Sequence, residues 1–219
     1  MTGIAENLQA IRERLRAAPG VTLLAVTKGQ SVERVRQAAA AGQNAFGENY
    51  VQEALAKMPA APGLEWHLIG PLQSNKTRAA AEHFDWVQTI DREKIARRLS
   101  EQRPAALAPL NVLIQVNASG EASKSGVVPG DAERLAAAVH DMPGLRLRGL
   151  MAIPEPGAPG ERYREVKAVF DRLRERYSLD TLSMGMSEDL DAAIAEGSTM
   201  VRIGTALFGP RGGLPTVGK

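Results

Sequence analysis

Residues 21–28 read Val21-Thr22-Leu23-Leu24-Ala25-Val26-Thr27-Lys28, a short and mostly apolar run that ends in a lysine, and Gly29 follows it. The run predicts a buried strand with an amine at its carboxyl end. In a barrel of alternating strands and helices, active sites form at that end. An amine partly stripped of water there loses its proton more readily, and the neutral amine can condense with an aldehyde. Taken alone, Lys28 is more simply explained as a surface lysine that ends a strand.

From this strand outward, short β-type runs alternate with amphipathic helical stretches. We expect strands at 21–27, 44–46, 65–69, 86–90, 110–116, 147–153, 182–185 and 200–204, with Gly47 closing the second. We expect helices at 4–18, 50–57, 74–82, 131–141 and 161–176, and after the capping residues Ser31, Asp91 and Ser187 as far as residues 41, 102 and 196.

This alternation predicts an α/β fold, a single (β/α)8 TIM barrel with an extra N-terminal helix. Eight strands that are each followed by a helical stretch imply a parallel sheet, and right-handed crossovers close it into a barrel. The main rival is an open doubly wound sheet. Such a sheet would usually carry a glycine-rich turn after the first strand, where this chain has Lys28 instead.

The bulk composition limits the classes of protein and of site. A chain of 219 residues, 44% of them hydrophobic, suits one domain over residues 1–219, and we expect residues 210–219 to form a loose tail. The chain has no cysteine, which excludes disulfides, thiolate metal sites and cysteine nucleophiles. Its histidines, His67, His83 and His140, show no ligand spacing, so we expect no metal site.

The charge pattern argues against nucleic acid and membrane partners. The formal net charge is +2, and arginine alternates with glutamate at 12–16 and 172–176, as on a solvated helix face. We see no basic stripe accompanied by stacking aromatics. Residues 1–7 lack the features of a signal peptide, and no apolar run is long enough to cross a bilayer. We therefore expect a soluble, cytoplasmic protein.

The loops after the last two expected strands offer groups that bind anions. They read Ser183-Met184-Gly185-Met186-Ser187 and Arg202-Ile203-Gly204-Thr205-Ala206, and barrels of this kind often bind a phosphate in these two loops. Ser187 lies where a helix is expected to begin, which attracts anions, but Glu188 and Asp189 place negative charge beside it. Taken singly, Ser187 is explained as an N-cap, and Gly204 with Thr205 as a turn.

Closure of the barrel makes the combination of Lys28 with the last loop a more specific signal than either feature alone. The last strand pairs with the first, so Lys28 and the pair Gly204-Thr205 should share one rim. An aldehyde-reactive amine beside a phosphate site is what pyridoxal 5′-phosphate (PLP) requires. Strand alternation then turns Arg202 into the barrel mouth, which is costly unless it meets a partner. That partner would be the pyridine nitrogen, kept unprotonated by the charged guanidinium. The alternative is a salt bridge from Arg202 to a barrel carboxylate.

At this point the chain resembles a known family, the pyridoxal phosphate homeostasis proteins, which are themselves similar to the N-terminal barrel of alanine racemase, the fold-type III PLP-binding barrel. The resemblance spans about residues 21–209. It is carried by Lys28 with its strand and by five further blocks: Phe46-Gly47-Glu48-Asn49-Tyr50-Val51-Gln52-Glu53, Trp66-His67-Leu68-Ile69-Gly70-Pro71-Leu72-Gln73-Ser74-Asn75-Lys76, Arg148-Gly149-Leu150-Met151-Ala152-Ile153-Pro154, Leu182-Ser183-Met184-Gly185-Met186-Ser187 and Arg202-Ile203-Gly204-Thr205-Ala206-Leu207-Phe208-Gly209.

The resemblance implies a role for each residue at the ring end of the cofactor. Lys28 would form the internal aldimine, which is a Schiff base. Asn49 would lie near the ring hydroxyl, and Arg202 would meet the pyridine nitrogen. Met151 would pack near the ring, with His67 close by.

At the phosphate end, the resemblance implies that Ser187, Gly204 and Thr205 hold the phosphate. The chain departs from the family pattern at two places. Gln30 stands where the family often has a proline, and Ala45 stands where a histidine is frequent. Neither position has a proposed bonding role, so the departures weaken only the local fit of those loops.

The second base decides between a carrier and an enzyme. Racemisation needs two bases on opposite faces of the cofactor, and in alanine racemase the second is a tyrosine from another domain of a partner subunit. Tyr163 and Tyr177 fit ordinary amphipathic helix faces here, whereas Tyr50 stays open because it adjoins Asn49. We therefore expect a non-catalytic protein that binds PLP and supports intracellular vitamin B6 homeostasis and, indirectly, amino-acid balance.

Two enzymatic alternatives remain at this stage. One is a PLP-dependent, racemase-like enzyme that takes an amino acid at the open face of the cofactor. The other is a sugar-phosphate enzyme on the same barrel, with Lys28 acting on a sugar carbonyl. The expected partners are PLP itself and PLP-dependent apo-enzymes as its acceptors. We expect a monomer, because this chain stops directly after the barrel and so lacks the second domain through which racemase subunits meet.

Overall fold

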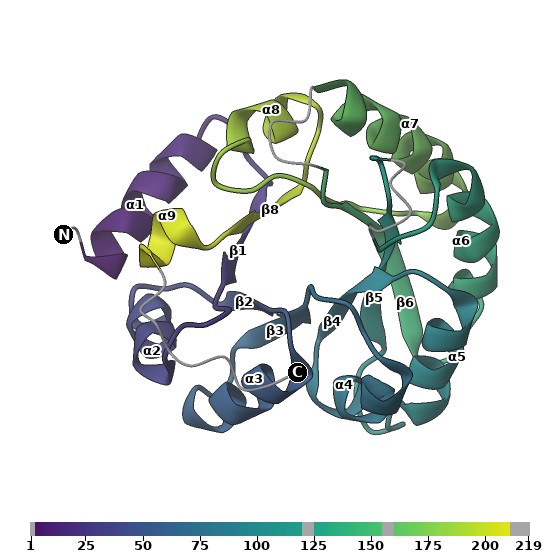
Figure 1. Cartoon of the computed structure of the whole chain (residues 1–219), viewed down its shortest axis with the longest axis horizontal. Helices are drawn as coiled ribbons and strands as arrows, with labels where there is room; N and C mark the ends of the chain where they lie inside the picture. The colour runs from purple at the N-terminus through teal and green to yellow at the C-terminus, as the bar shows by residue number, and fades with distance from the viewer. Residues whose placement is uncertain (1–2, 120–124, 155–159, 211–219) are drawn as a thin grey trace.

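The computed structural model describes residues 3–119, 125–154 and 160–210, and within them eight parallel strands close into a barrel (Figure 1). Each strand pairs with the next, and the last pairs with the first, which confirms the predicted fold class. The strands are β1 Thr22–Val26, β2 Ala45–Glu48, β3 Glu65–Leu68, β4 Trp86–Ile90, β5 Leu110–Val116, β6 Leu145–Ala152, β7 Thr181–Ser183 and β8 Met200–Ile203. The expected loose tail lies almost wholly outside the described residues.

The helices surround the barrel on its outside (Figure 1). They are α1 Ile4–Leu15, α2 Val32–Ala40, α3 Val51–Lys57, α4 Thr77–His83, α5 Glu93–Gln102, α6 Ala132–His140, α7 Gly160–Tyr177, α8 Leu190–Ala195 and α9 Thr205–Phe208, with 3-10 turns η1 Met58–Ala60, η2 Ser74–Lys76 and η3 Pro129–Asp131. The expected extra helix is α1, which buries Leu8, Ile11 and Leu15. No helix in the described ranges has the length and apolar character needed to cross a bilayer.

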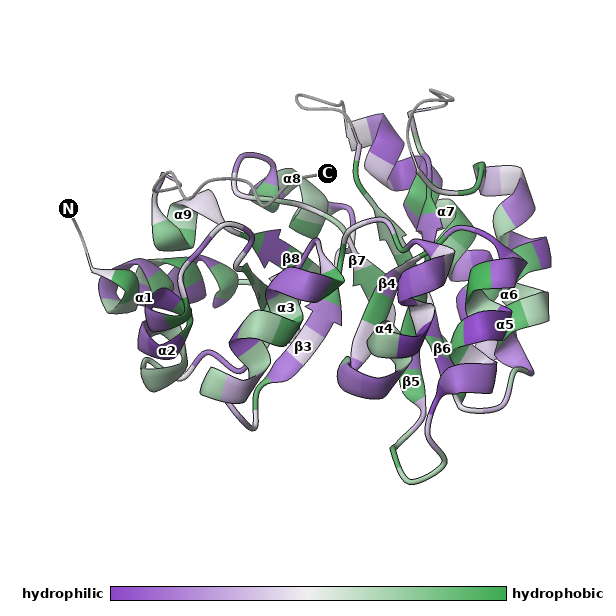
Figure 2. Cartoon of the chain, turned by 60° about the horizontal axis from the view of Figure 1, so that its bottom comes forward, coloured by the Kyte–Doolittle hydropathy of each residue, from purple (hydrophilic) through white to green (hydrophobic). Residues whose placement is uncertain are grey.

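Most of the hydrophobic core lies between the barrel and its helices. Phe46, Leu68 and Leu150 on the outward strand faces are fully buried there, and burial of such a side chain stabilises the fold by roughly 1.5–3 kcal/mol. Helices α3 to α6 each carry both hydrophobic and hydrophilic residues, as expected for helices that cover a barrel and also face water (Figure 2).

The barrel interior holds two smaller apolar clusters. Leu24, Ala45, Ile69 and Met200 form one cluster, from β1, β2, the end of β3 and β8. The other cluster consists of Trp86, Leu113 and Met151, from β4, β5 and β6. Buried polar side chains from the same strands lie inside the barrel with these clusters, and they form the site described below.

Gly47 was expected to close the second strand, and this prediction was wrong. Strand β2 runs through Gly47 to Glu48. A Cβ at Gly47 would lie 3.0 Å from Leu24 Cδ2 and 3.1 Å from Ile69 Cδ1, two side chains of the barrel interior. The glycine is therefore explained by close packing inside the barrel rather than by a turn.

The first two predicted helix caps have different outcomes. Ser31 caps α2 as expected, because its side chain accepts a hydrogen bond from the Arg34 backbone N–H. Asp91 does not cap α5, which begins at Glu93 with Arg92 in the capping position. The Asp91 carboxylate instead pairs with the Arg92 guanidinium at 2.7 Å, so it is not available to the helix.

Candidate functional site

The seam of the barrel pairs the first strand with the last. Strands β1 and β8 pair in parallel, with Thr22 opposite Met200 and Ala25 opposite Ile203. These two strands lie side by side in Figure 1. Lys28 and Gly204 follow their carboxyl ends, so both residues lie on the same rim. The predicted placement of the amine and of the loop after β8 on one rim is therefore confirmed. Lys28 itself is half-buried in the turn after β1.

A buried group of charged residues supports the turn that carries this amine. Lys57 Nζ of α3 lies 2.5 Å from Glu48 Oε1 and donates to the Thr27 carbonyl at 2.8 Å. The Thr27 hydroxyl donates to the same Glu48 oxygen at 2.6 Å. Glu53 Oε2 accepts a hydrogen bond from the Gly29 backbone N–H at 3.3 Å. The turn is thus tied on both sides of the lysine to β2 and α3.

Glu48 is the least solvated carboxylate of this group, with no exposed surface. Burial raises its pKa, against the opposite influence of Lys57. Its second oxygen, Oε2, is buried and has no hydrogen-bond partner among the described residues. The sequence analysis quoted Glu48 within a motif but gave it no role. In the structure its side chain meets Lys57 of α3.

Arg202 points into the barrel, as strand alternation predicted. Only 4% of it is exposed, and burial lowers its pKa to about 10, so the guanidinium stays charged at neutral pH. Its Nη1 donates to the Ser183 carbonyl and hydroxyl, both at 2.8 Å, and its Nη2 donates to the Ala152 carbonyl at 2.9 Å. The alternative salt bridge is not formed with any carboxylate of the described residues. Within the same ranges, the Arg202 Nε has no acceptor.

The loop after β8 begins a short helix that the sequence analysis did not predict. Gly204 is the N-cap of α9 and Thr205 is its first residue. The first N–H groups of a helix have no partner inside the helix, so this rim of the barrel presents backbone donors. A phosphate site in such barrels commonly includes the N-terminus of a short extra helix after β8.

Ser187 was predicted to cap α8, and this was wrong. Helix α8 begins at Leu190 with Asp189 in the capping position, and Ser187 lies in the turn before it. Asp189 Oδ1 accepts from the Met186 backbone N–H, and Oδ2 accepts from the Tyr163 hydroxyl, both at 2.5 Å. Of the two carboxylates that counted against an anion site, Asp189 is therefore held by its own loop and by α7.

Asn49 follows the end of β2 on the same rim and is half-buried. A Cβ at Gly70 would lie 2.1 Å from the Asn49 carbonyl oxygen, so only glycine lets the ends of β2 and β3 approach this closely. Met151 is fully buried inside the barrel, packed with Trp86 and Leu113. It is aligned with Ser183, the last residue of the neighbouring strand β7.

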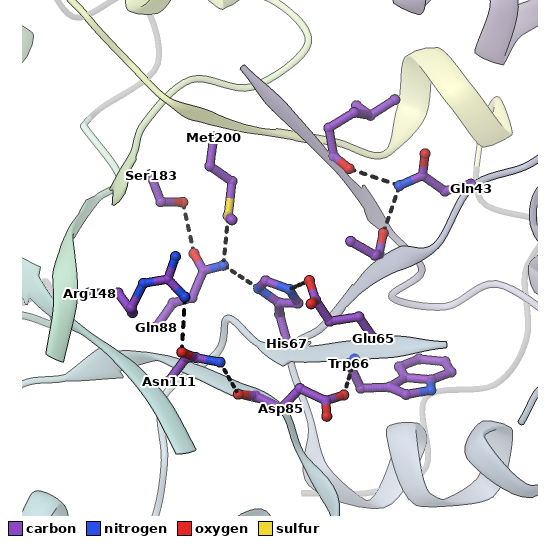
Figure 3. Close-up of polar contacts among 12 residues, drawn as sticks. Gln43, Glu65, Trp66, His67, Asp85, Gln88, Asn111, Arg148, Ser183 and Met200 are labelled. Atoms are coloured by element: carbon purple, nitrogen blue, oxygen red, sulfur yellow. Dashed lines mark hydrogen bonds and ion pairs between the residues drawn. The ribbon is translucent and has the colours of Figure 1, made fainter. Parts of the chain in front are cut away.

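His67 belongs to a chain of buried side chains that the sequence reasoning did not foresee. The Ser183 hydroxyl donates to Gln88 Oε1, Gln88 Nε2 approaches His67 Nδ1, and His67 Nε2 approaches Glu65 Oε1, each at 2.8 Å (Figure 3). The His67 ring also stacks on Trp86, with ring centroids 5.0 Å apart. The available signal was strand alternation, which puts a polar residue at an inward position of β3, β4, β7 and β8.

His67 should make the stability of the fold fall in mild acid. Burial lowers its pKa, although Glu65 and Asp85 oppose this. Below about pH 6.5, His67 therefore binds a proton in the unfolded chain but stays neutral in the folded chain. The stability that is present above that pH is lost as the pH falls. We expect urea unfolding to show a loss of up to about 1.4 kcal/mol per pH unit below pH 6.5, which His67→Gln should remove.

His140 provides the control for this measurement, because it lies on the exposed side of α6. His140→Gln should leave the pH dependence as in the unmodified chain. An equally steep fall in His67→Gln would show that other groups cause it.

Comparison with known proteins places the chain among PLP-related families. The model of the family described as the N-terminal domain of alanine racemase matches residues 1–212. The pyridoxal phosphate homeostasis protein of Pseudomonas aeruginosa is 59% identical over 226 residues, covering 96% of this chain and 97% of that protein. The protein of the same name in Escherichia coli K12 is 53% identical over 229 residues, covering 96% and 98%.

Solved structures are similar to this chain over nearly its whole length. The structure of PipY from Synechococcus elongatus with PLP bound has a TM-score of 0.84 at 37% identity, covering 94% of this chain and 100% of that one. An alanine racemase of Clostridium difficile has a TM-score of 0.78 at 13% identity, covering 98% of this chain and 58% of that one. At that identity the racemase likeness shows the shared fold alone.

Proposed function

The chain belongs to the alanine racemase N-terminal domain family and to the family of the pyridoxal phosphate homeostasis proteins, and from this premise we propose that it binds pyridoxal 5′-phosphate and takes part in vitamin B6 homeostasis. The observation that carries the proposal is the seam of the barrel, where Lys28 and Gly204 share a rim and Arg202 lies inside it. When bound, PLP supplies an aldehyde that can pass from one amine to another.

The residues at this rim fit the ring end of such a ligand. Lys28 would hold the aldehyde carbon as a Schiff base, with loss of water. The Arg202 Nε lacks an acceptor among the described residues, and an unprotonated pyridine nitrogen would provide one. Asn49 would lie near the ring hydroxyl, and Met151 would lie beneath the ring.

The phosphate end fits the loops after β7 and β8. Gly204 and Thr205 would offer backbone N–H groups and a hydroxyl at the start of α9. Ser187 would add a second hydroxyl from the turn before α8. The Asp189 carboxylate is engaged by Met186 and Tyr163, which reduces its repulsion of a phosphate.

Borohydride trapping tests this function directly. The purified chain incubated with PLP should gain visible absorbance, and reduction should fix the label on the Lys28 peptide, as located by mass spectrometry. A chain that stays colourless and unlabelled with added PLP would contradict the proposal and favour the sugar-phosphate alternative.

We further propose that the chain is not itself an enzyme, because no tyrosine of the described residues is placed as a second base. The chain has three tyrosines. Tyr163 and Tyr177 lie on the buried face of α7, and burial raises the pKa of Tyr163, which also donates to Asp189. Tyr50 lies at the rim but is 57% exposed. Formation of D-isomers from single L-amino acids, lost in Lys28→Ala, would support the racemase-like alternative instead.

Thr205→Val should weaken the hold on the phosphate. A hydrogen bond from a hydroxyl to a charged group is worth enough that we expect PLP affinity to fall about tenfold or more. Affinity for pyridoxal, which has no phosphate, should not change, and fluorescence titration with both ligands checks this. Thr22→Val is the matched control, since Thr22 is an exposed threonine at the opposite end of β1. Equal losses for both ligands would contradict the assigned role.

The remaining parts of the proposal concern partners and place. We propose that PLP-dependent apo-enzymes accept the cofactor, that the chain acts as a monomer and that it works in the cytoplasm. Transfer of PLP to a purified apo-enzyme faster than from free solution would support the first point, and light scattering tests the second.

A further inference from the structure

Hydrogen bonds cross the barrel interior in one continuous chain from Arg202 at the mouth to Glu65 at the opposite end. We propose that Gln88 and His67 are positioning residues, which hold the Arg202 guanidinium so that its Nε faces the ligand in the mouth. This inference rests on the proposed function. It concerns residues that reach Arg202 only through Ser183. Figure 3 shows the part of this chain from Ser183 through Gln88 and His67 to Glu65.

The chemistry at the two ends gives the chain a single direction. Arginine can only donate, so Ser183 Oγ accepts a hydrogen bond from Arg202. The Ser183 hydroxyl then donates its own hydrogen bond to Gln88 Oε1. The Gln88 amide therefore presents its NH2 group to His67 Nδ1, which must accept. The His67 proton therefore lies on Nε2, which donates a hydrogen bond to Glu65, an ionised carboxylate that can only accept. Each member fixes the orientation of the next.

Burial makes this order costly to break. His67, Gln88 and Ser183 have no exposed surface, so a lost partner leaves a polar atom without water to replace it. Trp86 stacks on the His67 ring and carries the Arg148 guanidinium 4.7 Å from its own ring centroid. Burial lowers the pKa of His67, which disfavours a second proton, and the hydrogen-bond chain requires a neutral ring.

Arg202 is the member of the hydrogen-bond chain that lies at the barrel mouth, and it connects this chain with ligand binding. Both terminal nitrogens of Arg202 are engaged, by Ser183 and by the Ala152 carbonyl, which fixes the guanidinium plane. Without Gln88, the Ser183 hydroxyl would lose its acceptor and would be free to rotate. The guanidinium would then lose its fixed orientation, while the turn that carries Lys28, which is held by Lys57 and Glu48, would be untouched.

Two substitutions at Gln88 test the proposal in the PLP-loaded protein. Gln88→Met keeps the length of the side chain and removes both polar atoms, and we expect PLP release into excess acceptor to be about tenfold faster. Gln88→Glu still accepts from Ser183, so it should keep Arg202 oriented and leave the release rate within twofold of that of the unmodified protein. Gln43→Met is the matched control, because Gln43 is also buried, but within the described residues its amide donates to the Leu23 and Ala45 carbonyls and has no link to Arg202.

The expected pattern separates positioning from a general loss of stability. Gln43→Met and Gln88→Met should both lower the melting temperature, but only Gln88→Met should change the release rate. Release from a folded Gln88→Met protein within twofold of the unmodified rate would overturn the proposal. So would equal acceleration by Gln43→Met.

Nitrogen NMR of the His67 ring gives a second test that needs no cofactor. The unmodified chain should show a neutral ring with its proton on Nε2, and Gln88→Glu should show protons on both nitrogens at neutral pH. A proton on Nδ1 in the unmodified chain would overturn the inference and leave the proposed function intact. Failure of borohydride trapping on Lys28, in contrast, would overturn the proposed function whatever the state of His67.

Discussion

Lys28→Ala is expected to abolish the visible absorbance of the PLP-loaded chain and its borohydride-stable label. The amine is the only group of this side chain that can condense with the aldehyde, and no other lysine shares the seam position next to Gly204 in the residues that the structure describes. Lys28→Arg should have the same effect, because it keeps the positive charge but cannot form the bond. Absorbance spectra and mass spectrometry of the reduced peptides measure both.

The control for this prediction is Lys76→Ala. Lys76 lies in η2, after β3, and has no proposed contact with the ligand. Its replacement should leave label and absorbance unchanged. A stable label that moves to Lys76, or that persists in Lys28→Arg, would show that the covalent site has been assigned to the wrong lysine.

Lys57→Met is expected to destabilise the fold by about 3–5 kcal/mol, because it removes the partner of a buried carboxylate. Glu48 has no exposed surface, and its Oε1 relies on Lys57 and Thr27 while its Oε2 has no partner among the described residues. The double variant Glu48→Gln with Lys57→Met should recover much of the loss, since no charge then remains buried. Urea unfolding of the three proteins at pH 8 measures the differences.

The pH dependence gives this prediction a definite sign. Burial already raises the pKa of Glu48, and loss of Lys57 raises it further. A carboxylate with a raised folded pKa favours the folded state below that pKa, so the deficit of Lys57→Met should shrink as the pH falls from 8 to 5. A deficit that grows in acid would contradict the assigned cause.

Lys167→Met is the matched control on the surface. Lys167 pairs with Asp171 one turn away on α7 at 2.6 Å, but both side chains are partly exposed. Exposed pairs contribute at most about 1 kcal/mol, so this variant should lose little. Equal losses at Lys57 and Lys167 would show that burial is not what makes the Glu48 pair important.

Regular alternation made most of the barrel predictable. Apolar runs such as 110–116 match β5 as the structure has it, and the amphipathic pattern of α1 placed Leu8, Ile11 and Leu15 on the buried face. Turn signals were less reliable, because glycine and aspartate serve more than one purpose. Gly47 looked like the end of a strand, yet it is required by the side chains of Leu24 and Ile69 across the barrel.

The site was predictable only in part, for a related reason. The side chains at the rim belong to motifs that can be read along the chain, and the inward direction of Arg202 follows from alternation along one strand. Gln88 and Ser183 carry no such local signal, because each is a polar residue in an otherwise buried strand. Their role appears only when strands 95 residues apart in sequence face each other across the barrel interior.

By itself, the sequence of this protein determined that alternating strands and helices would close into a barrel, and that its first and last strands would share a rim. Both follow from local periodicity and from the geometry of parallel strands. Only the tertiary structure decided which buried polar groups satisfy one another: Lys57 with Glu48 behind the rim, and Gln88 with His67 inside the barrel. A hydrogen bond depends on direction and distance between atoms of different elements, and packing alone sets these.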